Sequence, residues 1–399
     1  MPWRELSVSA QREEFVRLAM MQGANKSELC RRFGNSREKG YKWLRRYAAE
    51  GWGGLADRSR RPRASPERTP DAIEAEVLCL RAANNGAWGG RKIAAAMERA
   101  GLRAVPAPST ITEILRRHGK LGARAEEHPG PWQRFERATP NELWQMDFKG
   151  HFALPVGRCH PLTVLDDHSR YALGIEALAD ERAVSVRARL SAIFRRYGLP
   201  FAMIMDNGPP WGEGRGAGHT VFAAWLIRLG ICVSHGRPFH PQTCGKDERF
   251  HRSLKAEVLA GRALRDLAHC QRAFDDWRLV YNHQRPHEAL AMGVPAERYR
   301  LSPRPFPDTL PPIEYAPGDI VRKVQDGGRI SFNNRIWRVG KAFAGQAIAL
   351  RPSGDDGLFT VHFCAQPIGR IDLRAQACGF VDSAEEALPT TPQAPPPQQ

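Results

Sequence analysis

Hydrophobic positions in the first part of the chain recur every three or four residues, which is typical of short helices. Polar stretches divide residues 11–50 into three such segments. Ser27 and Ser36 stand where the second and third segments begin and are expected to be their N-caps, while Leu29 and Phe33, four residues apart, share one helix face. Three short helices joined by tight polar turns predict a helix-turn-helix module.

A second helical region follows the first. Residues 71–119 again divide into three segments, and the last has Ile111 and Ile114 at helical spacing behind Ser109, the expected N-cap. Segment 56–70, between the two regions, is rich in Arg, Pro and Ser and has no hydrophobic period, so an extended linker is expected there. Two helix-turn-helix modules in tandem favour a long, asymmetric DNA site over a short operator half-site.

The middle of the chain changes to strands alternating with helices. Runs 144–152, 160–178 and 201–208 are strand-like and end in polar or Gly-containing turns. A helical pattern over 181–198 separates the last two runs, and Val184 is expected to face inward together with the other apolar residues of that helix. This order predicts an α/β domain in which a mixed sheet is flanked by helices.

The last part of the chain is β-like. After the Pro-rich segment 301–315, six short strand-like runs separated by Gly, Asp and Asn predict a small β-barrel-like domain. The Pro- and Gln-rich end of the chain is expected to be disordered. The expected organisation is therefore a helix-turn-helix at 1–55, a basic linker at 56–70, a second helix-turn-helix at 71–122, a linker at 123–140, the α/β domain at 141–300, a linker at 301–315, the β domain at 316–378 and a tail at 379–399.

The net charge of the chain indicates what kind of partner it binds. The formal net charge is +16, and residues 1–70 alone hold 16 Lys and Arg against 8 Asp and Glu. Nucleic acid is favoured over an anionic membrane surface because no basic amphipathic anchor is present. No apolar run approaches the ~18 residues of a membrane span, and the chain's start has no signal-peptide pattern, so we expect a soluble, cytoplasmic protein. The eight cysteines form no CxxC pair, which favours reduced thiols without a metal.

Basic side chains of the N-terminal third are the candidate DNA contacts. The expected third helix would enter the major groove with Arg37, Lys39, Lys42, Arg45 and Arg46. The linker arginines Arg58, Arg60, Arg61 and Arg63 could lie along a minor groove. A plain solvated three-helix domain and a solvated tether remain the alternatives.

Three carboxylates carry the candidate chemistry. Asp147 lies among apolar residues in the first strand of the expected sheet, where an isolated charge is costly. Asp206 directly follows a strand, at the end where open sheets place their sites. Glu248 opens a helix in which Phe250 and Leu254 begin a core stripe, with Val258 continuing it, while Glu248, His251, Arg252 and Lys255 share another face. A salt-bridged helix surface is the alternative for Glu248 alone.

Convergence of these three carboxylates would suit a pair of hard divalent cations. Mg²⁺ prefers oxygen ligands, and two ions ~3.5–4 Å apart can align an attacking and a leaving oxygen on one phosphorus. Mn²⁺ is an equivalent choice. Nearby basic side chains would then bind flanking phosphates rather than transfer protons; the candidates are Lys246, Arg249, Arg252 and Lys255.

Four motifs resemble those of a known family. They are WQMDFKG at 144–150, LDDHSR at 165–170, MDNGP at 205–209 and HPQTCGKDERFHRSLK at 240–255. Together with the tandem N-terminal modules, these motifs resemble the bacterial insertion-sequence transposases of the DDE, retroviral-integrase-like group. The resemblance implies an RNase H-like core, a DDE triad of Asp147, Asp206 and Glu248, and cutting and joining of DNA at an element's terminal inverted repeats.

Two positions depart from the family pattern, and one motif has a second interpretation. Cys244 stands where Asn is usual, and Asp247 puts a negative charge where an apolar residue is common. The pair Asp166 and Asp167 forms another acidic cluster, which a turn with self-capping Asp side chains explains more simply than catalysis.

Two other functions remain open from the sequence. A sequence-specific DNA-binding repressor that has lost catalysis would keep the helix-turn-helix modules and need no metal. An RNA-directed nuclease of the RNase H type would leave the two modules without a role. The transposase interpretation further implies at least a dimer on DNA, because two element ends must be held together, and exposed apolar residues such as Trp52 are candidates for that contact.

Overall fold

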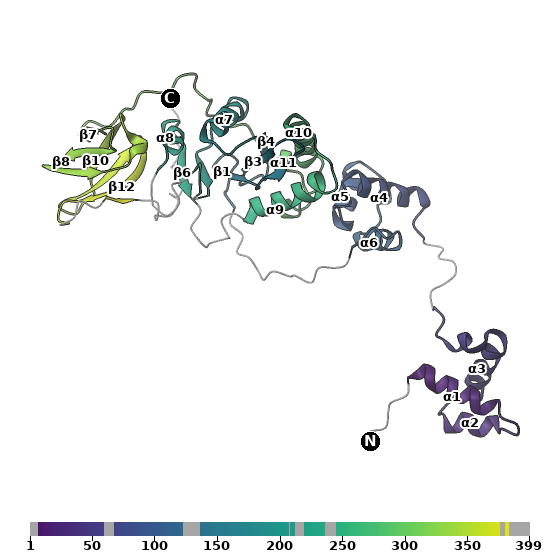
Figure 1. The fold of residues 1–399 in the computed structure, drawn as a ribbon. Coiled ribbons are helices and arrows are strands. Elements are labelled where there is room, and N and C mark those ends of the chain that lie inside the picture. The colour runs from purple at the N-terminus through teal and green to yellow at the C-terminus, as the bar shows by residue number, and fades with distance from the viewer. Residues whose placement is uncertain are drawn as a thin grey trace. The chain divides into compact units, whose positions relative to one another are not determined.

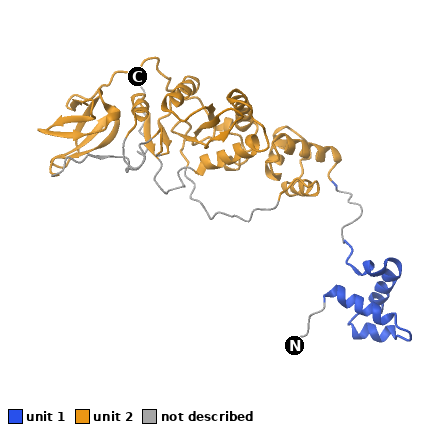
Figure 2. Cartoon of the chain, in the orientation of Figure 1, with its two compact units in different colours: residues 1–68 blue, residues 69–399 orange. Residues whose placement is uncertain are grey.

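A computed structural model describes seven stretches of the chain. These are residues 7–59, 68–122, 136–206, 208–211, 219–235, 245–375 and 380–382. The chain divides into two compact units, residues 1–68 and 69–399 (Figure 2). Within the described stretches, no helix has the length and apolar character that a membrane crossing requires.

The first unit is a three-helix module. Helices α1 (Val8–Ala19), α2 (Lys26–Arg32) and α3 (Arg37–Glu50) are followed by a short 3₁₀ helix, η1 (Gly51–Leu55) (Figure 1). Ser36 caps α3 as predicted, accepting from the Lys39 N–H at 3.3 Å. The prediction of Ser27 as a cap was wrong: the Asn25 side chain accepts from two backbone N–H groups at 3.1 Å and starts α2 two residues earlier.

Gly40 is the tightest point in this module. A Cβ atom at Gly40 would lie 2.4 Å from Cys30 Sγ and 2.9 Å from a Phe15 ring carbon. We expect Gly40→Ala to destabilise the first unit by about 1–3 kcal/mol, because the added methyl overpacks its core. Hydrogen exchange of residues 8–55 in the full-length protein measures this. Gly53→Ala, where nothing lies within 4 Å, is the control; equal protection in both variants would contradict the expectation.

The second helical module begins the second unit. It consists of α4 (Asp71–Ala83), α5 (Gly90–Arg99) and α6 (Pro108–Arg117) around a core that includes Trp88 and Met97. Ser109 is not the N-cap of α6, because the helix begins one residue earlier with Pro108 in its first turn, a position where the missing N–H costs no helical hydrogen bond.

A mixed sheet forms the centre of the second unit. Its strands are β1 (Leu143–Phe148), β2 (Phe152–Ala153), β3 (Arg158–Asp166), β4 (Ala172–Leu178), β5 (Ala202–Met205) and β6 (Cys232–His235). The order is β2-β3-β1-β5-β6, with β4 also paired to β3. β3 is antiparallel to β1 and β4, whereas β1, β5 and β6 are parallel. This confirms the predicted α/β, RNase H-like core, and the run 160–178 proves to be two strands joined by a turn.

Helices cover the sheet. They are α7 (Ala183–Tyr197), α8 (Val221–Arg228), α9 (Gly245–Leu254) with the π-helical η2 (Lys255–Leu259), α10 (Leu267–His283), the 3₁₀ turn η3 (Glu288–Leu290) and α11 (Pro295–Arg298). Val186, Leu190 and Phe194 of α7 are fully buried as predicted. Val184 is 81% exposed, so its predicted inward position was wrong: two residues before Val186 is about 200° around the helix.

The C-terminal part is an antiparallel β domain. Its strands are β7 (Ile320–Lys323), β8 (Arg329–Phe332), β9 (Arg335–Arg338), β10 (Ala347–Pro352), β11 (Leu358–Phe363), β12 (Gln366–Asp372) and β13 (Phe380–Asp382), with the turn η4 (Lys341–Phe343). One sheet has the order β13-β12-β11-β10-β7, and β8 pairs with β9. The six predicted strands are present, and barrel closure stays a prediction. β13 lies in the segment 379–399 expected to be disordered, so that expectation was wrong for 380–382.

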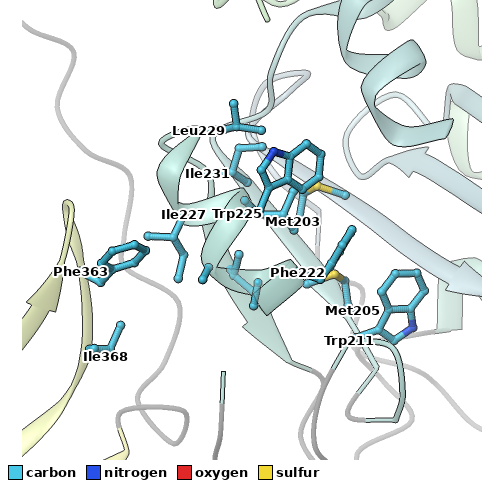
Figure 3. Packing of buried hydrophobic residues seen from close by; sticks show 14 of the residues in the cluster. Met203, Met205, Trp211, Phe222, Trp225, Ile227, Leu229, Ile231, Phe363 and Ile368 are labelled. Carbon is cyan, nitrogen blue, oxygen red and sulfur yellow. The ribbon is translucent and has the colours of Figure 1, made fainter. Parts of the chain in front are cut away.

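The β domain packs against helix α8 of the core. Figure 3 shows Phe363 and Ile368 of the β domain facing Ile227, within one hydrophobic cluster. Beside them the Gln366 side chain bonds both backbone groups of Val233, accepting from its N–H at 2.8 Å and donating to its carbonyl at 2.9 Å. The Gln366 side chain thus bonds the backbone N–H and carbonyl of Val233 in strand β6, as the backbone of a neighbouring strand would.

Candidate active site

Two of the three candidate carboxylates lie at the same level of the sheet. β1 and β5 are adjacent and parallel, with Gln145 opposite Ile204. Asp147 lies two residues after Gln145 in β1, and Asp206 lies two residues after Ile204, directly beyond the end of β5, so both stand near the same end of this pair of strands. The mixed sheet thus brings together two side chains that are 59 positions apart in sequence.

Helix α9, which carries Glu248, contacts strand β1 of the sheet. Its predicted core stripe, Phe250 and Leu254 followed by Val258, is buried. On another face, one turn after Glu248, His251 Nε2 lies 2.8 Å from Thr163 Oγ1, and its Nδ1 lies 3.9 Å from Asp147 Oδ2. Thr163 is the register partner of Asp147 and donates to its backbone carbonyl at 3.0 Å. His251 therefore fixes this helix face over Asp147.

Burial and neighbouring charges shift the pKa values of Asp147 and His251. Burial raises the pKa of Asp147 to about 6; the Phe148 N–H opposes this increase, and the negative charges of Asp206, Glu181 and Glu248 each add a smaller contribution to it. Burial also lowers the pKa of His251 to about 4, so this imidazole is neutral at pH 7. Both other candidate carboxylates are therefore close enough to disfavour ionisation of Asp147, which a bound cation would reverse.

The donor set fits a hard divalent cation. Carboxylate oxygens are the ligands that Mg²⁺ prefers, and their mutual repulsion is the electrostatic condition that a metal ion relieves. Within the described stretches, however, no three His, Cys, Asp or Glu side chains are arranged closely enough to hold a metal ion. The triad assignment stays a prediction, and residues 207 and 236–244, next to Asp206 and Glu248, lie outside the described ranges.

We expect Asp147→Asn to stabilise the metal-free protein at pH 8. A carboxyl whose pKa is about 6 when folded, against an ordinary 3.8, favours the folded state below pH 3.8 and loses that contribution as the pH rises through 6. The gain should be on the order of 1 kcal/mol, after allowance for solvent screening of a partly exposed side chain, and should shrink toward pH 4. Urea unfolding in EDTA at both pH values measures it; a variant less stable than wild type at pH 8 would contradict it.

Asp166 forms the predicted self-capped turn, whereas Asp167 bonds to other parts of the chain. Asp166 accepts from the Ser169 N–H at 2.7 Å and hydroxyl at 2.5 Å, and from the Asn141 N–H at 2.7 Å. Asp167 accepts from the Arg137 N–H at 2.9 Å and from two side chains of other elements. Both carboxyls are buried.

Asp247 is the residue that sequence reasoning placed wrongly. The sequence suggests an added charge beside Glu248, yet the Asp247 side chain is buried, and burial followed by the charges of Asp147 and Asp167 raises its pKa well above the usual range. The signal was in the sequence, since Asp247 is three residues before Phe250 and seven before Leu254 and so lies on the core stripe. Cys244, the other departure, lies outside the described residues.

The predicted DNA contacts of the first module lie mainly on its surface. Arg37, Lys39, Lys42 and Arg45 of α3 are exposed, and Arg46 is half-buried. Three cations surround the Trp43 ring, at 4.0 Å for Arg12, 5.3 Å for Lys42 and 5.0 Å for Arg46. Arg58 pairs with Glu50, while Arg60, Arg61 and Arg63 lie outside the described residues.

The basic residues of α9 divide into two groups. Arg249, Arg252 and Lys255 are exposed near Glu248, where they are free to meet a phosphate backbone. Lys246 is instead half-buried and forms an ion pair with Asp167. DNA binding by these residues stays a prediction.

Comparison with known protein families places each part of the chain. Residues 137–241 and 229–295 match integrase core domains, and residues 319–379 match the C-terminal domain of IS481 family transposases. A helix-turn-helix domain matches residues 11–63, and a homeodomain-like domain matches residues 39–115. By these matches the chain is similar to insertion-sequence transposases with an integrase core.

The chain is similar to two insertion-element proteins. It is 26% identical to the IS407 uncharacterized 31.7 kDa protein of Burkholderia multivorans, over 59% of this chain and 83% of that protein. It is 31% identical to the IS476 uncharacterized 39.2 kDa protein of Xanthomonas euvesicatoria, over 40% of this chain and 44% of that protein. Among solved structures, the BIV integrase catalytic core aligns with a TM-score of 0.30 and 23% identity, covering 39% of this chain and 92% of that one. The HTLV-2 integrase core in complex with magnesium aligns with a TM-score of 0.31 and 17% identity, covering 41% and 99%.

Proposed function

We propose that this protein is a transposase that cuts DNA at the terminal inverted repeats of an insertion sequence and joins the ends to target DNA, with divalent cations bound by a DDE triad. The observation that carries this proposal is the parallel pairing of β1, which bears Asp147, with β5, which ends directly before Asp206, together with the contact of His251 on the Glu248 helix with Asp147. This placement supports a site formed by acidic side chains from β1, the end of β5 and helix α9.

Acidic residues of the site would bind the metal ions, and basic residues of α9 would bind the DNA. Asp147, Asp206 and Glu248 would hold two Mg²⁺ or Mn²⁺ ions, which supply activation of a water or 3′-hydroxyl and stabilisation of the departing 3′-oxygen. Arg249, Arg252 and Lys255 would hold the flanking phosphates, so that the scissile phosphodiester meets the carboxylates in a fixed orientation. His251, neutral at pH 7, orients Asp147 and adds no charge of its own.

Recognition of the ends would fall to the N-terminal modules. Helix α3 presents exposed cations on the unit that matches a helix-turn-helix domain, and α4–α6 supply a second three-helix module. Two copies of the chain would hold two DNA ends in one complex, so we propose at least a dimer on DNA. Work on chromosomal DNA would place the protein at the bacterial nucleoid.

A strand-transfer assay tests the proposal. Duplexes carrying the element's own ends are incubated with the full-length protein over a titration of Mg²⁺ or Mn²⁺, and nicked and joined products are resolved on denaturing gels. We expect both products with either metal and none in EDTA. Specific binding without any cleaved product would favour the inactive repressor, and efficient hydrolysis of an RNA–DNA hybrid would favour the nuclease.

A further inference from the structure

Asp167 lies between the two elements that bear Asp147 and Glu248. Its side chain is buried completely, with no solvent access at the carboxylate. Full burial of a charged group is tolerated only when hydrogen bonds and an opposite charge compensate it. The partners of Asp167 are therefore informative about its role.

Each of the two side-chain partners stands two residues before a candidate metal ligand. Gln145 Nε2, on strand β1, donates to Asp167 Oδ1 at 2.7 Å. Lys246, in the first turn of α9, donates its ammonium to the same oxygen. The other oxygen accepts from the Arg137 N–H at 2.9 Å, so both are occupied.

This arrangement joins strand β1 to helix α9 through one carboxylate. Gln145 and Asp147 are on the same face of β1 because they are two residues apart. Lys246 and Glu248 lie within one turn of α9. A shift of α9 along the sheet would break the bonds of Asp167 as well as change the separation of the two ligands.

We propose that Asp167 is a positioning residue that fixes the spacing of Asp147 and Glu248 for metal binding, an inference that rests on the proposed function. A stabilising role alone does not require this chemistry, since apolar pairs of similar volume replace buried ion pairs with little loss of stability. Partners that orient metal ligands typically change metal affinity 10–100-fold when removed.

The neighbouring carboxylate offers a matched control. Asp166 is buried to the same extent and accepts three hydrogen bonds, but from Ser169 and Asn141, which lie outside β1 and α9. Loss of Asp166 removes a turn cap of comparable burial and leaves the link between strand and helix in place.

The test measures Mn²⁺ binding to the full-length protein by electron paramagnetic resonance, with no DNA present. For Asp167→Asn we expect affinity weakened 10–100-fold, and for Asp166→Asn affinity within about 3-fold of wild type. In strand transfer, Asp167→Asn should mainly raise the metal concentration that gives the half-maximal rate. The rate at saturating metal should fall by a smaller factor. Equal Mn²⁺ affinities for the two folded variants would overturn the proposal.

Two further variants keep the outcome interpretable. If Asp167→Asn does not fold, the volume-conserving Gln145→Met removes one of the three bonds and should weaken Mn²⁺ binding several-fold; unchanged affinity in that folded variant overturns the proposal. Asp147→Asn separates the two hypotheses. If Asp147→Asn binds Mn²⁺ as wild type does, the proposed function is wrong. If Asp147→Asn loses Mn²⁺ binding while Asp167→Asn keeps the wild-type affinity, only the positioning role of Asp167 is wrong.

Discussion

Replacing Glu248 with Gln is expected to lower DNA cleavage and strand transfer by roughly three orders of magnitude, about 4 kcal/mol of transition-state stabilisation. The amide keeps the shape of the side chain but removes the negative charge that would hold a cation. Glu248 is exposed on α9, while the buried stripe that holds the helix consists of other residues. The change should therefore leave the fold and the binding of element ends unaffected.

Single-turnover cleavage of labelled element ends measures this effect, with DNA affinity determined in parallel. Glu288→Gln serves as the control, because Glu288 is a surface residue near Arg91 and lies in a different element, η3. Its cleavage rate should equal that of wild type. Full cleavage by the Glu248→Gln protein, with unchanged binding, would show that the triad assignment is wrong.

Truncating Trp144 to Ala should lower the free energy of unfolding of the integrase core by about 3–5 kcal/mol, which is most of its stability. Trp144 is completely buried in β1, its ring lies 5.9 Å from that of Phe194, and its Nε1–H donates to Asn141 Oδ1 at 3.1 Å. The variant leaves a large cavity in the strand that bears Asp147 and removes one of two donors to Asn141 Oδ1, the other being the Tyr299 hydroxyl at 3.1 Å.

Urea unfolding followed by circular dichroism measures this loss for the full-length protein. Leu279→Ala, at a position of α10 that is 53% exposed, is the comparison and should change stability by less than about 0.5 kcal/mol. Similar midpoints for the two variants would mean that the packing of β1 against α7 contributes less than its burial indicates.

Local patterns predicted the elements well and their exact ends less well. Six of the seven described strands of the β domain and the core stripe of α9 follow from local patterns. The caps expected at Ser27 and Ser109 failed because a neighbouring Asn25 or Pro108 offers a better helix start. Val184 failed because an apolar residue in a helix is not inward unless it shares the phase of the stripe.

The sequence predicted which residues belong to the candidate site, but not how they are arranged in space. Strand ends and a helix start pointed to Asp147, Asp206 and Glu248, but their relative level depends on the parallel pairing of β1 with β5. The link through Asp167 depends on contacts across more than twenty positions to Gln145 and nearly eighty to Lys246, for which the sequence carries no periodic signal.

Diffraction from crystals grown with Mn²⁺ tests the triad most directly. The carboxylates of Asp147, Asp206 and Glu248 should ligate two anomalous peaks ~3.5–4 Å apart, and both peaks should weaken in the Glu248→Gln protein. Mn²⁺ bound only elsewhere, or Glu248 turned away from the two aspartates at saturating metal, would contradict a shared metal centre and leave a protein that binds DNA ends without cutting them.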